Sequence, residues 1–171
     1  PRTDAAWERE VAAHPGATVF HSRAWAEVLA ETYGHRPFYC RFSRNGETVA
    51  LLPLMRVDSP LSGVRGVSLP FTDFCEPLFF DEADGDDLAA ELVALAQREK
   101  WKHLELRGAA LAPRGAKPSV AFYAHSVTLA DVSQLTANLS APVRRAIRKA
   151  ERSGLEGRIM TSRDAMLDYY N

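Results

Sequence analysis

Apolar residues recur at helical spacing in two segments near the start of the chain. The segment "DAAWEREVAAHPG" (residues 4–16) predicts a short amphipathic helix that ends before Pro15-Gly16, since neither residue continues a helix well. A second helix is expected to begin after Ser22, a good N-cap residue, and to end at Gly34. Its apolar residues lie three to four positions apart: Trp25, Val28, Leu29 and Tyr33.

Strand patterns dominate the middle of the chain. Two strand-like runs flank Asn45-Gly46, the dipeptide preferred in tight hairpin turns. The second run, residues 48–54, is apolar at almost every position, which indicates a strand buried in a sheet. The segment "GVRGVSLPFTDFCEPLFF" (residues 63–80) predicts a strand, a loop containing proline and another strand. Two elements are expected after it: a helix over residues 84–100 and a strand over residues 103–108.

The remaining chain predicts a second folding unit. Residues 109–119 ("AALAPRGAKPS") are rich in Pro, Gly and Ala, which is typical of a linker or a long loop. A new strand is expected over residues 120–129 and a basic helix over residues 138–155. We therefore expect an α/β (α+β) fold with a mainly antiparallel sheet flanked by helices in residues 1–118. Residues 119–171 are expected to be the incomplete beginning of a second unit of a longer protein.

The composition is that of a globular protein with an ordinary core. The chain has 171 residues, 46% of them hydrophobic, and a formal net charge of −1, so a broadly positive surface for coating nucleic acid is not expected. No apolar run reaches the roughly 18 residues that span a bilayer, and nothing resembles a signal peptide, which predicts a cytoplasmic protein. Cys40 and Cys75 lie far apart without the spacing of a zinc site, so no metal is expected.

Basic side chains concentrate on one side of the segment "NLSAPVRRAIRKAERSGL" (residues 138–155). In a helix, its apolar and basic residues fall on opposite faces, and the basic face consists of Arg144, Arg145, Arg148, Lys149 and Arg152. Glu151 and Glu156 are expected to relieve part of the repulsion by contacts with Arg148 and Arg152. The face can be solvated, docked on the acidic residues 81–87, or bound to a phosphate or carboxylate, which the planar fork of arginine recognises. DNA binding is disfavoured because the face carries almost no Asn, Gln or Ser to read bases.

The same segment resembles the R-x-x-I-R-K-A-x-x-x-G-[VL] signature of FemAB-like transferases, in "VRRAIRKAERSGL". Four upstream segments are similar, in order, to a bacterial subgroup associated with exopolysaccharide and protein-sorting gene clusters: "VFHSRAWAEVLAETYGHRPFY", "GETVALLPLMRV", "GVSLPFTDFCEPLF" and "HLELRG". The resemblance covers the chain from Val19 to Tyr170. It implies two units of the GNAT-like acyltransferase fold in tandem, with a substrate groove that involves both.

The resemblance also implies a reaction. An aminoacyl or acyl group would be transferred from aminoacyl-tRNA or acyl-CoA to an amine of a phosphate-bearing precursor. That acceptor would be a small anionic or a lipid-linked molecule of the cell envelope or of exopolysaccharide. By position, Arg144 would hold the substrate phosphate, with Arg148 as the second candidate.

The sequence differs from the family pattern in two respects. Characterised members use a lysine on an early helix for the same phosphate, and the corresponding place here is Leu29. The Q/R-x-x-G-x-G/A loop with which GNAT enzymes hold coenzyme A is also missing from the sequence, so no cofactor is expected within this chain. The alternative is a non-catalytic module of the same fold that binds an anionic ligand or a protein partner.

The predicted loop after residue 68 contains two residues with chemically useful side chains. Asp73 can act as a general base or orient a substrate amine, or it can cap a turn. Cys75 can act as a nucleophile only with a nearby base, for which His21, His35 and His103 are the options. A buried, unreactive thiol is the simpler expectation for Cys75.

Three further residues are candidates for substrate binding. Trp25 and Phe71 can line a groove, or they can pack in the core as aromatic residues at such spacing usually do. Arg107 ends the "LELR" strand, where it can reach into a cleft or pair with Glu105 or Asp73.

Overall fold

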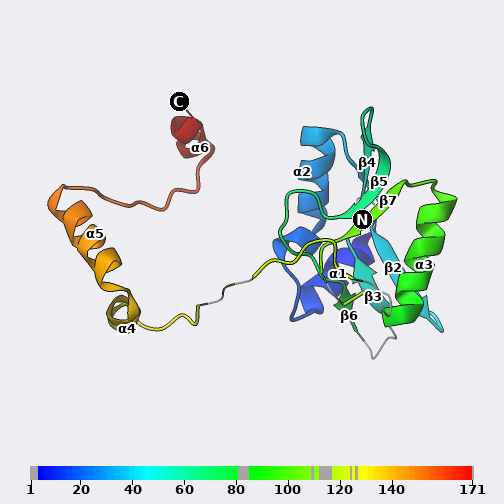
Figure 1. The fold of residues 1–171 in the computed structure, drawn as a ribbon, viewed down its shortest axis with the longest axis horizontal. Helices are drawn as coiled ribbons and strands as arrows, with labels where there is room; N and C mark the ends of the chain where they lie inside the picture. Colours follow the sequence, from blue (N-terminus) through cyan, green and yellow to red (C-terminus); the bar gives the residue numbers. More distant parts are fainter. Residues whose placement is uncertain are drawn as a thin grey trace. The chain divides into compact units, whose positions relative to one another are not determined.

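The computed structural model describes residues 4–80, 85–108, 110–111, 117–123, 125 and 127–170 (Figure 1). The chain divides into two compact units: unit 1, residues 1–119, and unit 2, residues 120–171. Asp81, Glu82 and Asp84, considered above as part of a docking surface for the basic helix, lie outside the described residues. Part of the predicted linker also lies outside them.

Unit 1 begins with helices. α1 spans Ala5–Ala13, and a short 3₁₀ helix, η1, spans Val19–His21. α2 spans Arg23–Tyr33, and Ser22 caps it, because its Oγ accepts a 3.2 Å hydrogen bond from a backbone N–H of the first turn. Gly34 ends α2 with a φ of 68°, a left-handed conformation that glycine adopts at little cost. Both helices begin and end where the sequence predicts.

The described strands of unit 1 form two sheets. One has the strand order β1-β4-β5-β7 and the other the order β2-β3-β6. Neighbouring strands are antiparallel except β5 and β7, which are parallel and so end at the same edge of their sheet. The prediction of a mainly antiparallel α/β fold is confirmed, whereas the sequence pattern does not predict the division into two sheets. The strands are β1 (Arg36–Pro37), β2 (Cys40–Arg44), β3 (Glu47–Leu52), β4 (Met55–Ser59), β5 (Gly63–Ser68), β6 (Leu78–Phe79) and β7 (His103–Leu106).

The predicted hairpin joins β2 to β3. Its turn residues, Asn45 and Gly46, have φ values of 53° and 86°, the positive φ at both positions that a tight type I′ turn requires. The predicted helix in the acidic stretch is α3, which spans Gly85–Arg98. Asp86 and Asp87 lie in its first turn, where the helix dipole stabilises negative charge.

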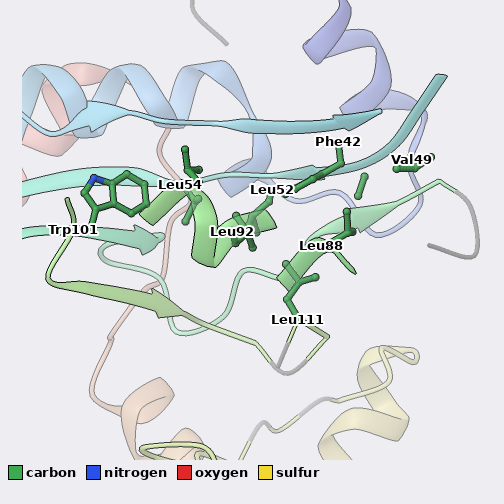
Figure 2. Packing of buried hydrophobic residues seen from close by; sticks show 10 residues of the cluster. Phe42, Val49, Leu52, Leu54, Leu88, Leu92, Trp101 and Leu111 are labelled. Atoms are coloured by element: carbon green, nitrogen blue, oxygen red, sulfur yellow. The ribbon is translucent and has the colours of Figure 1, made fainter. Parts of the chain in front are cut away.

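Three clusters of buried apolar side chains hold unit 1 together. The largest joins α3 to the β2-β3-β6 sheet, and Figure 2 shows Leu88 and Leu92 with Leu52 in this cluster. β3 is buried on both faces, since Leu52 belongs to that cluster whereas Leu51 packs with Trp7 of α1. The remaining cluster joins α2 to β4 and β5 through Ala26, Leu29, Met55, Val57 and Val67. Each fully buried Leu or Val contributes about 1.5–3 kcal/mol, so these clusters supply the main stabilisation.

Unit 2 is helical in its described part. It contains α4 (Val132–Asn138), α5 (Ala141–Arg152) and α6 (Arg163–Tyr170), and none of their described side chains is buried. α5 is the predicted basic helix. It follows Ser140, carries proline in its first turn, and ends before Gly154, whose φ is 72°. α4 is not predicted by the sequence pattern, although Asp131 caps it by accepting a 2.9 Å hydrogen bond from a backbone N–H of its first turn.

The predicted strand over residues 120–129 is wrong. The described residues in this range, 120–123, 125 and 127–129, are in neither a strand nor a helix. A strand needs a neighbour whose N–H and C=O groups complete its hydrogen-bond ladder. The described part of unit 2 contains no other strand that can serve as that neighbour.

Candidate functional site

Four candidate residues of unit 1 lie on or beside one loop. The β5–β6 loop (residues 69–77) leaves the edge of the sheet at which β5 and β7 both end. Phe71 and Asp73 lie on this loop, and Arg107 directly follows β7. Trp25, from α2, packs in the same apolar cluster as the loop residue Leu69. The tertiary structure therefore gathers side chains that are far apart in the sequence.

Arg107 ties the loop to the end of β7. Its Nε donates a 2.7 Å hydrogen bond to Glu105, and its Nη1 donates to the backbone oxygen of Thr72 on the loop. Its backbone N–H donates to Ser68 Oγ at 3.0 Å, and its backbone oxygen accepts a 2.8 Å hydrogen bond from Cys75 N. Arg107 thus pairs with Glu105, one of the two alternatives that the sequence left open, and it positions the loop.

The other three candidates differ in exposure. Trp25 is half-buried and packs edge-on against Phe20, with ring centroids 5.3 Å apart, so it is mainly a core residue. Phe71 is 58% exposed and does not belong to any of the core clusters. Asp73 is exposed and has no hydrogen-bond or ion-pair partner among the described residues, so it does not cap a turn there. Its side chain is therefore accessible to solvent.

His21 is the histidine that comes near Cys75, with Nε2 3.9 Å from the sulfur. The backbone N–H of Thr18 donates to His21 Nδ1 at 3.1 Å, so this nitrogen carries no proton. The neutral ring then carries its proton on Nε2 and donates it to the backbone oxygen of Glu76 at 2.9 Å. Burial lowers the pKa of His21, which keeps the ring neutral at pH 7. His21 therefore has no free lone pair with which to deprotonate Cys75.

The thiols are correspondingly unreactive. Burial, with a smaller contribution from the Glu76 carboxylate, raises the pKa of Cys75 to about 12. Burial likewise raises the pKa of Cys40 to about 12, although Arg98 acts in the opposite direction. Since the thiolate is the nucleophilic form of cysteine, neither residue suits nucleophilic catalysis at neutral pH.

The place of the family's phosphate-binding lysine offers no cation in this chain. Leu29 is 1% exposed and packs with Ala26 against the strands β4 and β5. This side of α2 therefore faces the core and offers no charged group to a ligand.

The basic face of α5 is the second candidate region. Arg145, Arg148, Lys149 and Arg152 are all exposed, and none forms an ion pair with another described residue. The relief expected from nearby acids is not found: Glu156 pairs with Arg158 at 3.0 Å instead of with Arg152. Four cations of α5 thus lie close together without an ion pair to a described carboxylate.

Arg144 lies at the margin of this face and makes contacts of its own. Its Nη1 donates to the backbone oxygen of Ala137 at 3.0 Å and also to that of Leu139, at the C-terminal end of α4. A cation at this place satisfies carbonyl groups that lack helical partners and complements the helix dipole. Arg144 therefore joins α4 to α5, while its Nε and Nη2 make no hydrogen bond to another described residue.

Comparison with protein-family models, with curated proteins and with solved structures finds no match to this chain. Among the residues that the structure describes, no helix is long and apolar enough to cross a membrane. In the same residues, no three His, Cys, Asp or Glu side chains gather as a metal site would require. The β5–β6 loop of unit 1 and the basic face of α5 therefore remain the two candidate regions.

Proposed function

We propose that this chain is part of a cytoplasmic FemAB-like transferase of the GNAT superfamily. It would transfer an aminoacyl or acyl group to an amine of a phosphate-bearing cell-envelope or exopolysaccharide precursor. The acceptor is a small anionic or a lipid-linked molecule, and the donor is aminoacyl-tRNA or acyl-CoA. The proposal rests on the family signature in α5 and on the charge of that helix.

The observation that carries the proposal is the uncompensated basic face of α5. Like-charged pairs at i, i+4, such as Arg144–Arg148 and Arg148–Arg152, each cost about 0.2–0.5 kcal/mol in an isolated helix. No described carboxylate forms an ion pair with these arginines. A phosphate would relieve the repulsion, because each guanidinium can offer two parallel N–H donors to two phosphate oxygens. Arg148 lies in the middle of the face, and Arg144 would contribute its Nε and Nη2.

In the proposed reaction, the acceptor amine attacks the carbonyl carbon of the donor. A C–N bond forms, the C–S bond of acyl-CoA or the C–O bond of aminoacyl-tRNA breaks, and the amine loses a proton. Positioning of the anionic acceptor supplies most of the rate acceleration, since it makes the attack effectively intramolecular. A general base accepts the amine proton, and the leaving thiolate or alkoxide takes up a proton. The inactive thiols fit this direct transfer, which needs no covalent enzyme intermediate.

Calorimetric titration of the chain with inorganic pyrophosphate tests the anion site. We expect Arg148→Ala and Arg144→Ala each to weaken binding by about 1.5–3 kcal/mol, the contribution of a hydrogen bond between charged groups. Arg158→Ala is the matched control, because it removes one exposed arginine of unit 2 that already pairs with Glu156. Unchanged pyrophosphate affinity in both α5 variants would contradict the proposal that α5 binds an anion.

Helicity measured on the same variants separates anion binding from structural support. Arg144→Ala also removes the hydrogen bonds to the end of α4, so we expect it to reduce the helical circular dichroism signal. Arg148 makes no such contact with another described residue, so Arg148→Ala should leave the circular dichroism signal unchanged. A loss of binding in Arg144→Ala alone, with a loss of helicity, would assign that arginine a purely structural role.

The alternative function is a non-catalytic module that binds an anionic polymer or a protein partner. The missing coenzyme A loop favours it. Transfer assays distinguish the two functions, with acyl-CoA or aminoacyl-tRNA as donor and a nucleotide-linked amino sugar precursor as acceptor. Product formation that Arg148→Ala reduces supports the transferase, whereas pyrophosphate binding without transfer supports the module.

A further inference from the structure

A cavity of about 380 Å³ lies between β2 and α3 in unit 1. Its lining is mainly apolar, because Phe38, Phe42, Leu92 and Leu95 line it and belong to the largest core cluster or pack against it. Phe42, Leu92 and Leu95 are at most 9% exposed, so they form the floor of the cavity. Cavities of this size with an apolar lining and a few polar groups are typical of ligand sites. We call this cavity the β2–α3 groove.

The groove extends to the backbone of β2. Cys40, Arg41 and Phe42 all line it, although successive side chains of a strand point to opposite faces. The Arg41 side chain is held on the side of α1, since its guanidinium pairs with Asp4 at 2.6 Å and with Glu10 at 2.8 Å. The groove therefore offers a ligand the strand backbone as well as the side chains that face α3.

β2 has a free edge among the described strands. It is the terminal strand of the β2-β3-β6 sheet and pairs only with β3. In an edge strand, the N–H and C=O groups of every second residue point away from the sheet and lack a strand partner. Such an edge can take up an extended peptide as an additional strand.

Two opposite charges line the groove without an ion pair. Glu91 and Arg98 are exposed residues of α3, and neither forms an ion pair or a hydrogen bond with another described residue. The charge of Arg98 also reaches Cys40 on β2, where it opposes the rise in the thiol pKa that burial causes. The two charges lie about two helical turns apart, or about 10 Å along the axis of α3.

The direction of α3 determines the order of these charges along β2. Trp101, which follows α3, packs edge-on against Phe38 with ring centroids 5.2 Å apart, so the C-terminal end of α3 lies beside the start of β2. Figure 2 shows Trp101 and Leu88 toward opposite ends of the cluster, with Phe42 at the end of Leu88. The cation of the groove therefore lies toward the start of β2 and the carboxylate toward its end.

We propose that the β2–α3 groove binds a short extended peptide with both termini free, as an additional strand antiparallel to β2. The terminal ammonium pairs with Glu91 and the terminal carboxylate with Arg98. A tripeptide in strand conformation is about 10 Å long, which matches the spacing of the two charges, and its apolar side chains pack on the floor of the groove. This site lies in unit 1 and is independent of the anion site proposed on α5.

Charge complementarity selects the peptide among ligands that fit an apolar groove. A fatty acid would pair with Arg98 alone and would be repelled by Glu91, whereas an alkyl amine would meet the reverse situation. An uncharged apolar molecule would leave both charges unused. A peptide with free termini pairs with both side chains and also supplies N–H and C=O groups for the edge of β2.

Titration of the whole chain with the tripeptide alanyl-leucyl-alanine tests the site. We expect the backbone ¹H–¹⁵N NMR signals of residues 40–42 to shift as the peptide occupies the edge of β2. N-acetylation and C-terminal amidation of the peptide should each weaken binding by about three- to fivefold, the scale of one exposed ion pair. The absence of shifts up to about 10 mM peptide would overturn the proposal, because a ligand with a Kd near 1 mM would then be close to saturation.

Two variants assign the termini of the peptide to their partners. Arg98→Gln should weaken binding of the free peptide by about three- to fivefold, and amidation of the peptide should then have no further effect. Glu91→Gln should remove the effect of acetylation in the same way. Lys100→Gln is the matched control, because Lys100 is an exposed cation just after α3 that does not line the groove. Equal losses in the Arg98 and Lys100 variants would overturn the proposal, since they would indicate a general effect of charge.

Ligand length and class supply the last arm of the test. Free leucine carries both charges but is too short to reach Glu91 and Arg98 together, and octanoate carries only the negative charge. Both should bind more weakly than the tripeptide. Equal or tighter binding of either would overturn the assignment of an extended peptide. Pyrophosphate binding by α5 is measured separately, so failure of either proposal leaves the other intact.

Discussion

Several side chains in this protein have roles that depend on their hydrogen-bond partners more than on their chemical type. Judged only by the 3.9 Å between His21 Nε2 and Cys75 Sγ, these residues resemble a catalytic pair. The hydrogen bonds of His21 to Thr18 and Glu76 determine its tautomer and leave it without a free lone pair. Its role is to hold the segment before α2 against Glu76 of the β5–β6 loop, which is a structural function.

We expect the stability of unit 1 to decrease as the pH falls below about 6.5. The pKa of His21 is lowered in the folded state by burial, so the unfolded chain takes up the proton first as the pH falls. The stabilisation is complete above the ordinary histidine pKa of 6.5 and is lost progressively as the pH approaches the lower folded value. Urea unfolding between pH 8 and pH 5 measures this slope.

His21→Asn supplies the control for this pH dependence. Asparagine keeps a donor for the backbone oxygen of Glu76 but does not titrate. The variant should be less stable at every pH, with a shallower slope between pH 7 and 5. His35, whose pKa is also lowered by burial and by Arg65, accounts for part of the remaining slope. An unchanged slope in the variant would show that His21 does not cause the effect.

At the scale of elements, close packing between β5 and the chain that leads into β7 limits which residues are tolerated. Gly66 lies in β5, and a Cβ atom there would lie 2.2 Å from Cζ3 of Trp101. Trp101 is 8% exposed and packs edge-on against Phe38 at 5.2 Å, so its ring has little room to move. A glycine is therefore required at position 66 so that the Trp101 ring can pack against the β5 backbone.

Gly66→Ala is expected to destabilise the protein by about 1–3 kcal/mol, the usual cost of overpacking a core. Gly157→Ala is the control: no heavy atom lies within 4 Å of its added Cβ, and a change within about 0.5 kcal/mol is expected. Urea denaturation gives both values. In a Trp101→Leu background the cost of Gly66→Ala should shrink, because the clash is removed. The same cost in both backgrounds would contradict this explanation.

At the scale of the whole molecule, the apolar cores are distributed unequally. All three clusters of buried residues lie in unit 1, and the described helices of unit 2 bury no side chain. Cooperative unfolding requires a core whose burial offsets the loss of chain entropy. The two units should therefore behave differently when separated.

Residues 1–119 are expected to unfold in one cooperative thermal transition when produced alone. Residues 120–171 are expected to show a weak helical signal without such a transition, because short helices are marginal in water without packing. Circular dichroism during heating checks both fragments. A sigmoidal transition in residues 120–171 would contradict the expectation, as would the absence of one in residues 1–119.

The sequence by itself determines most of the local structure. Ser22 and Gly34 mark the ends of α2, Asn45-Gly46 specifies the β2–β3 turn, and the nearly continuous apolar run over residues 48–54 predicts that β3 is buried in a sheet. These signals lie within a few residues of the structure they encode, so they can be read without knowing the fold. The strand expected over residues 120–129 fails because a strand requires a partner that local sequence does not supply.

The candidate regions depend on tertiary structure to a larger extent. Phe71 and Asp73 are visible as candidates in the sequence, but the stacking of Tyr33 and His35 with Phe71 is not, because it arises only from the packing of α2 beside the β5–β6 loop. Arg144 is recognisable by its motif, yet its hydrogen bonds to the end of α4 follow from a helix that the pattern does not predict.

The sequence alone thus determined the helices, turns and buried strand of unit 1 and the charge of α5, since these follow from local periodicity and from the residues that cap each element. The tertiary structure alone decided which distant side chains meet. It joined Arg107 to the β5–β6 loop by hydrogen bonds, fixed the tautomer of His21 and stacked Phe71 with Tyr33 and His35. The physical reason is that contacts between residues far apart in the chain arise from the packing of whole elements, which no local pattern encodes.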